Sequence, residues 1–129
     1  MIDSPDFDFS FAGLKTAVLY LVKKSGPLNQ YRRAEIAREF EEAVVDVLVS
    51  KTVRAALTRR VKTVIAAGGV AANHQLRRRL QTALQQNVPA ATLLLPPPEL
   101  TTDNATMMAL AAFWRHRAKR RPAARAVAA

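Results

Sequence analysis

The hydrophobic residues near the start of the chain first alternate with polar residues and then follow helical spacing. In the segment FDFSFAG, Phe7, Phe9 and Phe11 fall on one side of an extended chain, which predicts a half-buried strand closed by Gly13. Apolar residues then recur every third or fourth position over residues 14–24, which predicts a helix that ends at the Ser-Gly-Pro sequence. A short strand followed by a short helix is therefore expected.

The next segment carries a helical pattern throughout. Between Gln30 and Arg60 the apolar positions repeat on one side of a helix, and most charged positions lie on the other sides. The pattern fits one long helix, and it equally fits two helices that meet near Ser50. The apolar side contains Ile36, Phe40, Val44, Val47 and Leu48.

A different pattern begins at Val61. The β-branched residues of VKTVIAAGG stop at a glycine pair, Gly68 and Gly69, which predicts a short buried strand. Residues 73–86 return to helical spacing. The apolar run in ATLLLPPPEL predicts a second short strand, because the three prolines that follow cannot continue a ladder of backbone hydrogen bonds.

The last pattern is again helical. Thr101 or Thr102 is expected to cap a final helix. Three of its large side chains are expected to pack in the core: Met107, Met108 and Trp114. Residues 119–129 are expected to form a frayed basic tail, which leaves residues 1–118 as one folded unit.

The order of elements from residue 61 to residue 117 is strand, helix, strand, helix. This order is typical of a parallel α/β unit with right-handed crossovers, and ligands bind beyond the carboxyl ends of the strands in such sheets. Those ends are the glycine pair and the loop that leads to Asp103. We therefore expect both segments at the same edge of the sheet.

Length and composition narrow the class of protein. A chain of 129 residues is long enough for one domain, and its apolar runs are shorter than the ~18 residues of a membrane span. The absence of cysteine excludes a disulfide scaffold and thiolate metal sites, and it suits a cytoplasmic protein. We expect a helix-rich α/β protein that does not associate with a membrane.

The charge balance favours a polyanionic partner such as RNA. Twenty Lys and Arg residues stand against ten Asp and Glu residues, which gives a formal net charge of +10. Basic residues cluster at positions 59–60, 77–79 and 115–121. Blocks of charge are usually solvated helix faces, so the run Arg77–Arg79 has two interpretations: an exposed face, or a contact with RNA phosphates.

The glycine pair also has two interpretations. Gly68 and Gly69 fit a tight turn between a strand and a helix, and they also allow a phosphate to approach the backbone near a helix N-terminus. Asn73, at the start of the following helix, is suited to capping that helix or to a hydrogen bond with a ligand. The residues themselves do not separate these alternatives.

Four segments in order resemble the carboxyl-terminal half of the TsaD family. They are DFSFAGLKT, IAREFEEAVVDVLVSKT, AAGGVAANHQLR and PPELTTDNATMMA, and the resemblance extends from residue 6 to about residue 118. These tRNA threonylcarbamoyladenosine synthases, also called Gcp, are related to the Kae proteins and belong to the actin-like, or ASKHA, superfamily with a ribonuclease H-like fold. The resemblance implies a part of such an actin-like domain, with a short sheet and flanking helices.

The resemblance also implies an acyltransferase activity and a set of site residues. The family transfers a threonylcarbamoyl group from threonylcarbamoyl-adenylate to the adenosine beside the anticodon of tRNA. By the family motif GGVxxN, Gly68, Gly69 and Asn73 would contact the adenylate or ATP. By the motif TDNGAM, Asp103 would be a ligand of one divalent metal ion, iron or zinc, since carboxylate oxygens suit hard cations. Lys15 lies in the segment that matches FSFSGLKT.

The chain departs from the family pattern at several points. Ala105 stands where the family usually has glycine, and Ala12 stands where it usually has serine. The family's two metal-binding histidines form an HxxxH motif in the amino-terminal half, and His74 and His116 do not form one. Catalytic metal sites normally use three or more protein ligands, so this chain alone is expected to be inactive.

Three hypotheses for the chain follow. It is a carboxyl-terminal piece of the transferase, whether a gene fragment, a mis-called start or one half of a split protein, and it works with tRNA and family partners such as TsaB and TsaE. It is a basic RNA-binding module without catalysis, although Phe7, Phe9 and Phe11 lie far from the arginine clusters. Or it is a module that pairs with another subunit through an exposed apolar face.

Overall fold

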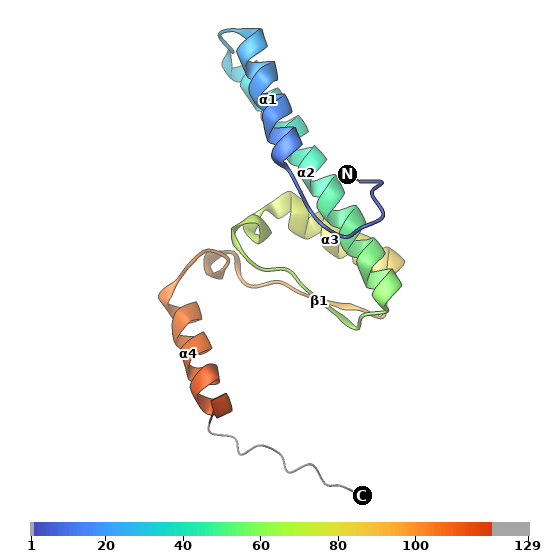
Figure 1. Ribbon diagram of the computed structural model, residues 1–129, viewed down its shortest axis with the longest axis vertical. Helices are drawn as coiled ribbons and strands as arrows, with labels where there is room; N and C mark the ends of the chain where they lie inside the picture. The colour runs from blue at the N-terminus through green and yellow to red at the C-terminus, as the bar shows by residue number, and fades with distance from the viewer. Residues whose placement is uncertain (1, 120–129) are drawn as a thin grey trace, which may run out of the picture.

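The computed structural model describes residues 2–119, which form a helix-rich α/β arrangement (Figure 1). The chain folds into a helical hairpin, a pair of short parallel strands, and a final helix that points away from both. Its elements are α1 (Ala12–Ser25), α2 (Gln30–Arg59), β1 (Thr63–Ile65), η1 (Gly69–Ala72), α3 (His74–Asn87), β2 (Thr92–Leu94), η2 (Pro98–Leu100) and α4 (Ala105–Lys119).

The hairpin of α1 and α2 confirms the two helices expected from the periodicity. Gly26, with φ of +66°, ends α1, and the side chain of Asn29 caps α2 by accepting a 2.8 Å hydrogen bond from the Arg32 N–H. The helix α2 runs unbroken past Ser50 to Arg59, and the next residue, Arg60, ends it with a left-handed conformation. The segment that permitted one helix or two is therefore a single helix of 30 residues.

The strand predicted around Phe7–Phe11 is wrong. Among residues 2–119 this segment has no strand partner, and it leads directly into α1. The side chain of Lys51 on α2 is only 1% exposed, and its ammonium donates to Ser4 Oγ, Asp6 Oδ1 and Asp8 O over 2.7, 2.8 and 2.6 Å. Side-chain donors on α2, rather than a neighbouring strand, therefore hold the amino-terminal segment.

A second basic residue, one helical turn further along α2, reinforces this attachment. The Arg54 guanidinium donates to the carbonyls of Ser4 and Asp6 and lies 5.6 Å from the centroid of the Phe7 ring. The hydrogen bond from Lys51 lowers the pKa of Asp6 below its ordinary value of 3.8. The amino-terminal segment is thus attached to α2 through both its carbonyls and its one paired carboxylate.

The two short strands pair in parallel, as predicted, with Val64 opposite Leu93. The helices α2 and α3 pack on one face of this sheet. Their contact forms the core, which consists of Val45, Val49, Ala56, Leu76, Leu80, Leu84 and Val88. The strand before the glycine pair was expected to be buried, and this is wrong for Thr63 and Ile65, which are exposed. Ile65 is 70% exposed, because its side chain points to the face of the sheet that α2 and α3 do not cover.

The final helix exists as predicted, but its cap and its packing differ from the expectation. Asn104, rather than Thr101 or Thr102, caps α4 by accepting a 2.8 Å hydrogen bond from the Met107 N–H. Met107, Met108 and Trp114 do not lie in the core: they are 43%, 65% and 59% exposed. Figure 1 shows the reason, since α4 extends away from the helices that form the core.

Two further expectations concern the carboxyl-terminal tail and membrane-spanning helices. Lys119 is the last described residue and belongs to α4, and the rest of the predicted basic tail lies outside the described residues. Within residues 2–119, no helix combines the length and the apolar character needed to cross a bilayer.

Candidate functional site

The glycine pair and the proline-rich loop lie at one edge of the sheet, as the order of elements predicted. The strands β1 and β2 run in the same direction, and the Ala66 N–H donates to the Leu94 carbonyl over 3.2 Å just beyond them. The chain then continues from β1 into η1 and from β2 into η2, and these two turns contact each other. Two segments about thirty residues apart in sequence thus form one surface.

The two glycines have different roles in the turn. Gly68 adopts φ of +91°, a conformation that side-chain-bearing residues rarely adopt, so glycine is required there by the backbone. Gly69 has no such conformation, and a Cβ atom placed on it would meet nothing within 4 Å. Gly68 therefore shapes the turn, and open space lies beside the backbone at both glycines.

The turn does not lead straight into the following helix. The short helix η1 separates the glycine pair from α3, which begins only at His74. Within it, the Ala71 N–H donates to Gly68 O over 2.9 Å, and the Asn73 N–H donates to Val70 O over 3.1 Å. These two amide groups are already paired, so they do not extend the row of free helix N–H groups that the sequence suggested for an anion.

Asn73 joins α3 to α2. Its Oδ1 accepts a 2.8 Å hydrogen bond from the Leu76 N–H, which makes it the N-cap of α3. Its Nδ2 donates to Glu41 Oε1 on α2 over 2.5 Å. A side-chain amide has two N–H groups and two oxygen lone pairs, so one donor and one acceptor remain for a ligand. Capping and ligand contact, the two alternatives for Asn73, are therefore not exclusive.

A cavity of about 650 Å³ opens beside this pair of residues. Its size lies within the range of small-molecule sites, roughly 300–1,000 Å³. The wall from α2 includes Phe40, Glu41 and Val44, and the wall from the glycine turn includes Val70 and Asn73. The cavity is thus largely apolar, with a carboxylate and an amide placed together at one side. Sequence reasoning missed Glu41, because its partner lies 32 positions away along the chain.

The arginine run after Asn73 is partly structural. Arg77 donates through Nε to Ala71 O over 3.1 Å and through both terminal nitrogens to Pro96 O. Arg79 pairs with Asp46 on α2 over 2.5 Å, while Arg78 is exposed. Arg77 therefore connects the glycine turn to the proline-rich loop, a role that the sequence did not indicate.

Asp103 lies on the exposed loop between η2 and α4. Its neighbour Asn104 is engaged in the cap of α4 and also donates to Thr102 O over 2.8 Å. Both His74 and His116 are exposed. In the part of the chain from residue 2 to residue 119, no three His, Cys, Asp or Glu side chains lie close enough together to hold a metal ion. The described residues alone do not fit a catalytic metal.

Comparisons with known proteins agree with the motifs. Residues 2–110 match the family model "TsaD: tRNA N6-adenosine threonylcarbamoyltransferase". A protein of that description from Symbiobacterium thermophilum is 51% identical over 112 residues, which cover 87% of this chain and 32% of the relative. The corresponding protein from Desulfotalea psychrophila is 43% identical, with 89% of this chain and 34% of the relative covered.

The chain belongs to the TsaD family, because the family model matches most of its length. It spans about a third of the length of the curated relatives that it matches. The matched range includes the glycine turn, Glu41, Asn73 and Asp103.

Proposed function

We propose that the chain supplies the adenylate-binding part of a tRNA N6-adenosine threonylcarbamoyltransferase with an actin-like fold. The observation that carries this proposal is the cavity beside Glu41 and Asn73, which opens at the glycine turn beyond a parallel strand. Membership of the TsaD family supports the reaction, which transfers a threonylcarbamoyl group from threonylcarbamoyl-adenylate to an adenosine of tRNA. Such chemistry belongs in the cytoplasm, where tRNA is modified.

The apolar walls, the polar pair and the glycine turn have separate roles in this proposal. The apolar walls from Val44, Leu48 and Val70 cover the faces of the adenine ring. The remaining N–H of Asn73 and the Glu41 carboxylate bind polar atoms of the nucleoside, and the open space beside Gly69 lets the rest of the adenylate pass close to the backbone.

A metal enters the proposal only through Asp103. We assign this carboxylate as one ligand of the divalent ion, iron or zinc, that the family resemblance implies. The described residues provide no complete ligand set, so we derive no catalytic step through the ion. The transfer reaction therefore requires ligands from outside the described residues, and we expect the isolated chain to be inactive.

The proposal also includes the molecules with which the complete enzyme would work. We infer that tRNA is the acceptor, that threonylcarbamoyl-adenylate or ATP is the nucleotide ligand, and that subunits such as TsaB and TsaE cooperate with the complete enzyme. A pairing module remains the second candidate function. The exposed apolar side chains along α4 favour it, because large exposed apolar patches usually mark contact surfaces.

Reconstitution tests the proposed function. The chain is combined with a second polypeptide, namely the part of the Symbiobacterium thermophilum relative that it does not match. Modified tRNA nucleosides are then measured by mass spectrometry. We expect modified tRNA from the mixture and none from the chain alone. Asp103→Ala in the mixture should abolish the product. Glu99→Ala is the control and should not, because Glu99 is an exposed acidic residue on η2. Product from the chain alone, or an undiminished Asp103→Ala mixture, contradicts the proposal.

A further inference from the structure

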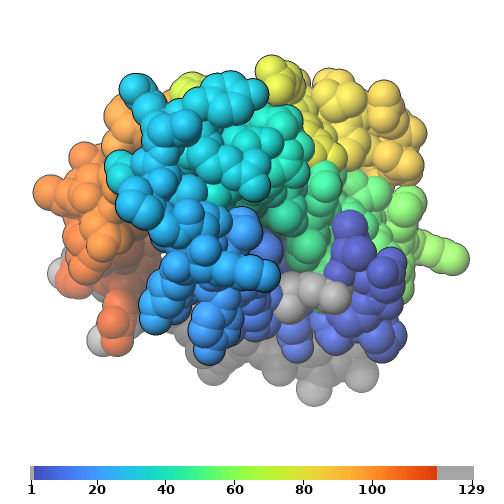
Figure 2. All heavy atoms as spheres, turned by 90° about the horizontal axis from the view of Figure 1, so that it is seen from above, coloured from blue at the N-terminus to red at the C-terminus, as the bar shows by residue number. Residues whose placement is uncertain are grey.

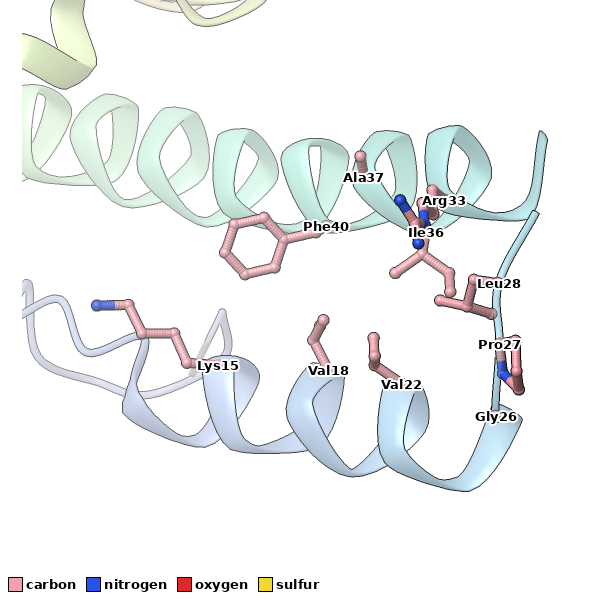
Figure 3. Close-up of a pocket in the computed structure, with 10 residues that line it drawn as sticks. All are labelled: Lys15, Val18, Val22, Gly26, Pro27, Leu28, Arg33, Ile36, Ala37 and Phe40. Atoms are coloured by element: carbon pink, nitrogen blue, oxygen red, sulfur yellow. The ribbon is translucent and has the colours of Figure 1, made fainter. Parts of the chain in front are cut away.

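A groove runs between α1 and α2 near the closed end of the hairpin, away from the glycine turn (Figure 3). Its volume is about 620 Å³. Val18 and Val22 point across it from α1 toward Ile36 and Phe40 on α2, and the loop at residues 26–28 closes one end. No residue of α1 is buried, so the two helices border the groove without filling it.

The charged side chains that line this groove are both basic. Lys15 lies toward the open end, and Arg33 lies near the loop (Figure 3). Among the described residues, neither side chain has an ion-pair or hydrogen-bond partner. A second cavity between the two helices differs, because Arg32 there pairs with Glu35 over 2.5 Å. The positive charge of the groove is thus uncompensated.

The dimensions suit a helix. The part of α1 that borders the groove, from Lys15 to its end, is about 16 Å long at 1.5 Å per residue, or roughly three helical turns. An amphipathic helix of that length places its apolar face on such a surface through residues at i, i+3, i+4 and i+7. Viewed from above, the closed end of the hairpin is not covered by other segments (Figure 2).

Charge and the aliphatic lining together decide which partner the groove binds. A second copy of this chain is disfavoured, because each copy has a formal net charge of +10. RNA is disfavoured at this position, because the lining is mainly aliphatic and its one aromatic side chain, Phe40, is only partly exposed. We propose that the groove between α1 and α2 binds an amphipathic helix of a partner protein whose apolar face is flanked by acidic residues.

Two synthetic probes test this proposal directly. Both are fluorescently labelled helical peptides of about 14 residues with the same leucine face, and the polar positions are Glu in one and Lys in the other. In anisotropy titrations with the full chain, we expect the acidic peptide to bind with a micromolar dissociation constant and the basic peptide to bind at least about tenfold more weakly. Neither result depends on the transfer activity.

Variants of the chain assign the binding to the groove. The double variant Lys15→Glu/Arg33→Glu is expected to weaken the acidic peptide by about tenfold or more and to reverse the preference, while Val18→Asp weakens both peptides. The matched control is Lys23→Glu/Lys24→Glu, because these lysines belong to the same helix but do not line the groove. Circular dichroism verifies that each variant keeps its helix content.

The outcomes that overturn the proposal are equally specific. They are the absence of saturable binding, equal affinity for both peptides, or equal effects of the groove variants and the matched control. Sedimentation equilibrium of the chain alone tests the other occupant. Self-association that disappears in Val18→Asp would assign the groove to a second copy and overturn the proposal.

Discussion

Glu41 on α2 accepts a 2.5 Å hydrogen bond from the side-chain amide of Asn73, the residue that caps α3. This contact joins the long helix of the hairpin to the turn that follows the glycine pair. It also places a carboxylate and an amide side by side at the wall of the 650 Å³ cavity. The relationship links a structural role, capping, to the proposed binding of the nucleotide.

Substitution of Glu41 separates these two roles. Glu41→Ala leaves the Asn73 N–H without its partner, and we expect it to lower stability by about 1 kcal/mol and to weaken binding of AMP by about tenfold. Glu41→Gln keeps an acceptor oxygen and is expected to retain most of the stability. The control is Glu35→Ala, because Glu35 pairs with Arg32 on the same helix and neither residue lines the cavity. Urea unfolding and calorimetric titration with AMP measure the two effects, and equal AMP affinity in all three variants would contradict the assigned role.

Arg77 is expected to control the mobility of the site edge. Arg77→Lys keeps the charge but removes the forked donor that reaches both Ala71 O and Pro96 O. We expect faster hydrogen exchange at residues 68–72 and a loss of about 1–3 kcal/mol in stability. The exposed neighbour provides the comparison, since Arg78→Lys should change stability by less than about 0.5 kcal/mol. Indistinguishable exchange in the two variants would show that Arg77 does not join the segments.

The attachment of the amino-terminal segment should depend on pH. Lys51 lowers the pKa of Asp6 in the folded protein below its ordinary value of 3.8. The ionised carboxylate therefore stabilises the fold at pH values above 3.8. This stabilisation is lost as the pH falls through the lower pKa of the folded state. The measurement is the difference in unfolding free energy between the natural chain and Asp6→Asn. We expect this difference to be present at pH 7 and to shrink below pH ~4. A difference that is unchanged at low pH would rule out this ion pair as its source.

Truncation should cost much more stability at a core position than at an exposed one. Leu84 on α3 is 2% exposed and belongs to the core, so Leu84→Ala is expected to cost about 2–5 kcal/mol. Met108 is 65% exposed on α4, and Met108→Ala should change the stability of the isolated chain by less than about 0.5 kcal/mol. Urea denaturation of both variants decides the matter. A large loss for Met108→Ala would mean that α4 packs on the core after all.

Local patterns predicted the helices, the two strands and the edge of the sheet where the candidate site lies. They failed where a distant residue decides the conformation. The alternation around Phe9 indicated a strand, but Lys51 and Arg54 capture the carbonyls and the carboxylate of that segment from α2. No local pattern reports such a partner.

The apolar spacing of α4 shows a related limit. It correctly indicated a helix, yet the spacing does not show where a neighbour for the apolar side chains lies, and Met108 and Trp114 are exposed on α4. The candidate site shows the same division. Asn73 could be identified from its position after GGV, whereas Glu41 and Arg77 became evident only when α2 and the loop at residues 96–103 were placed beside it.

The central claim is that the cavity beside Glu41 and Asn73 binds an adenine nucleotide. The most direct test titrates AMP into the isotopically labelled chain and follows the backbone amides of residues 68–73 and the side-chain amide of Asn73 by NMR. The account predicts saturable shifts centred on these groups, weakened at least about tenfold in Asn73→Ala but not in Asn87→Ala at the other end of the same helix. Absence of shifts at the glycine turn, or shifts confined to other surfaces, would contradict it.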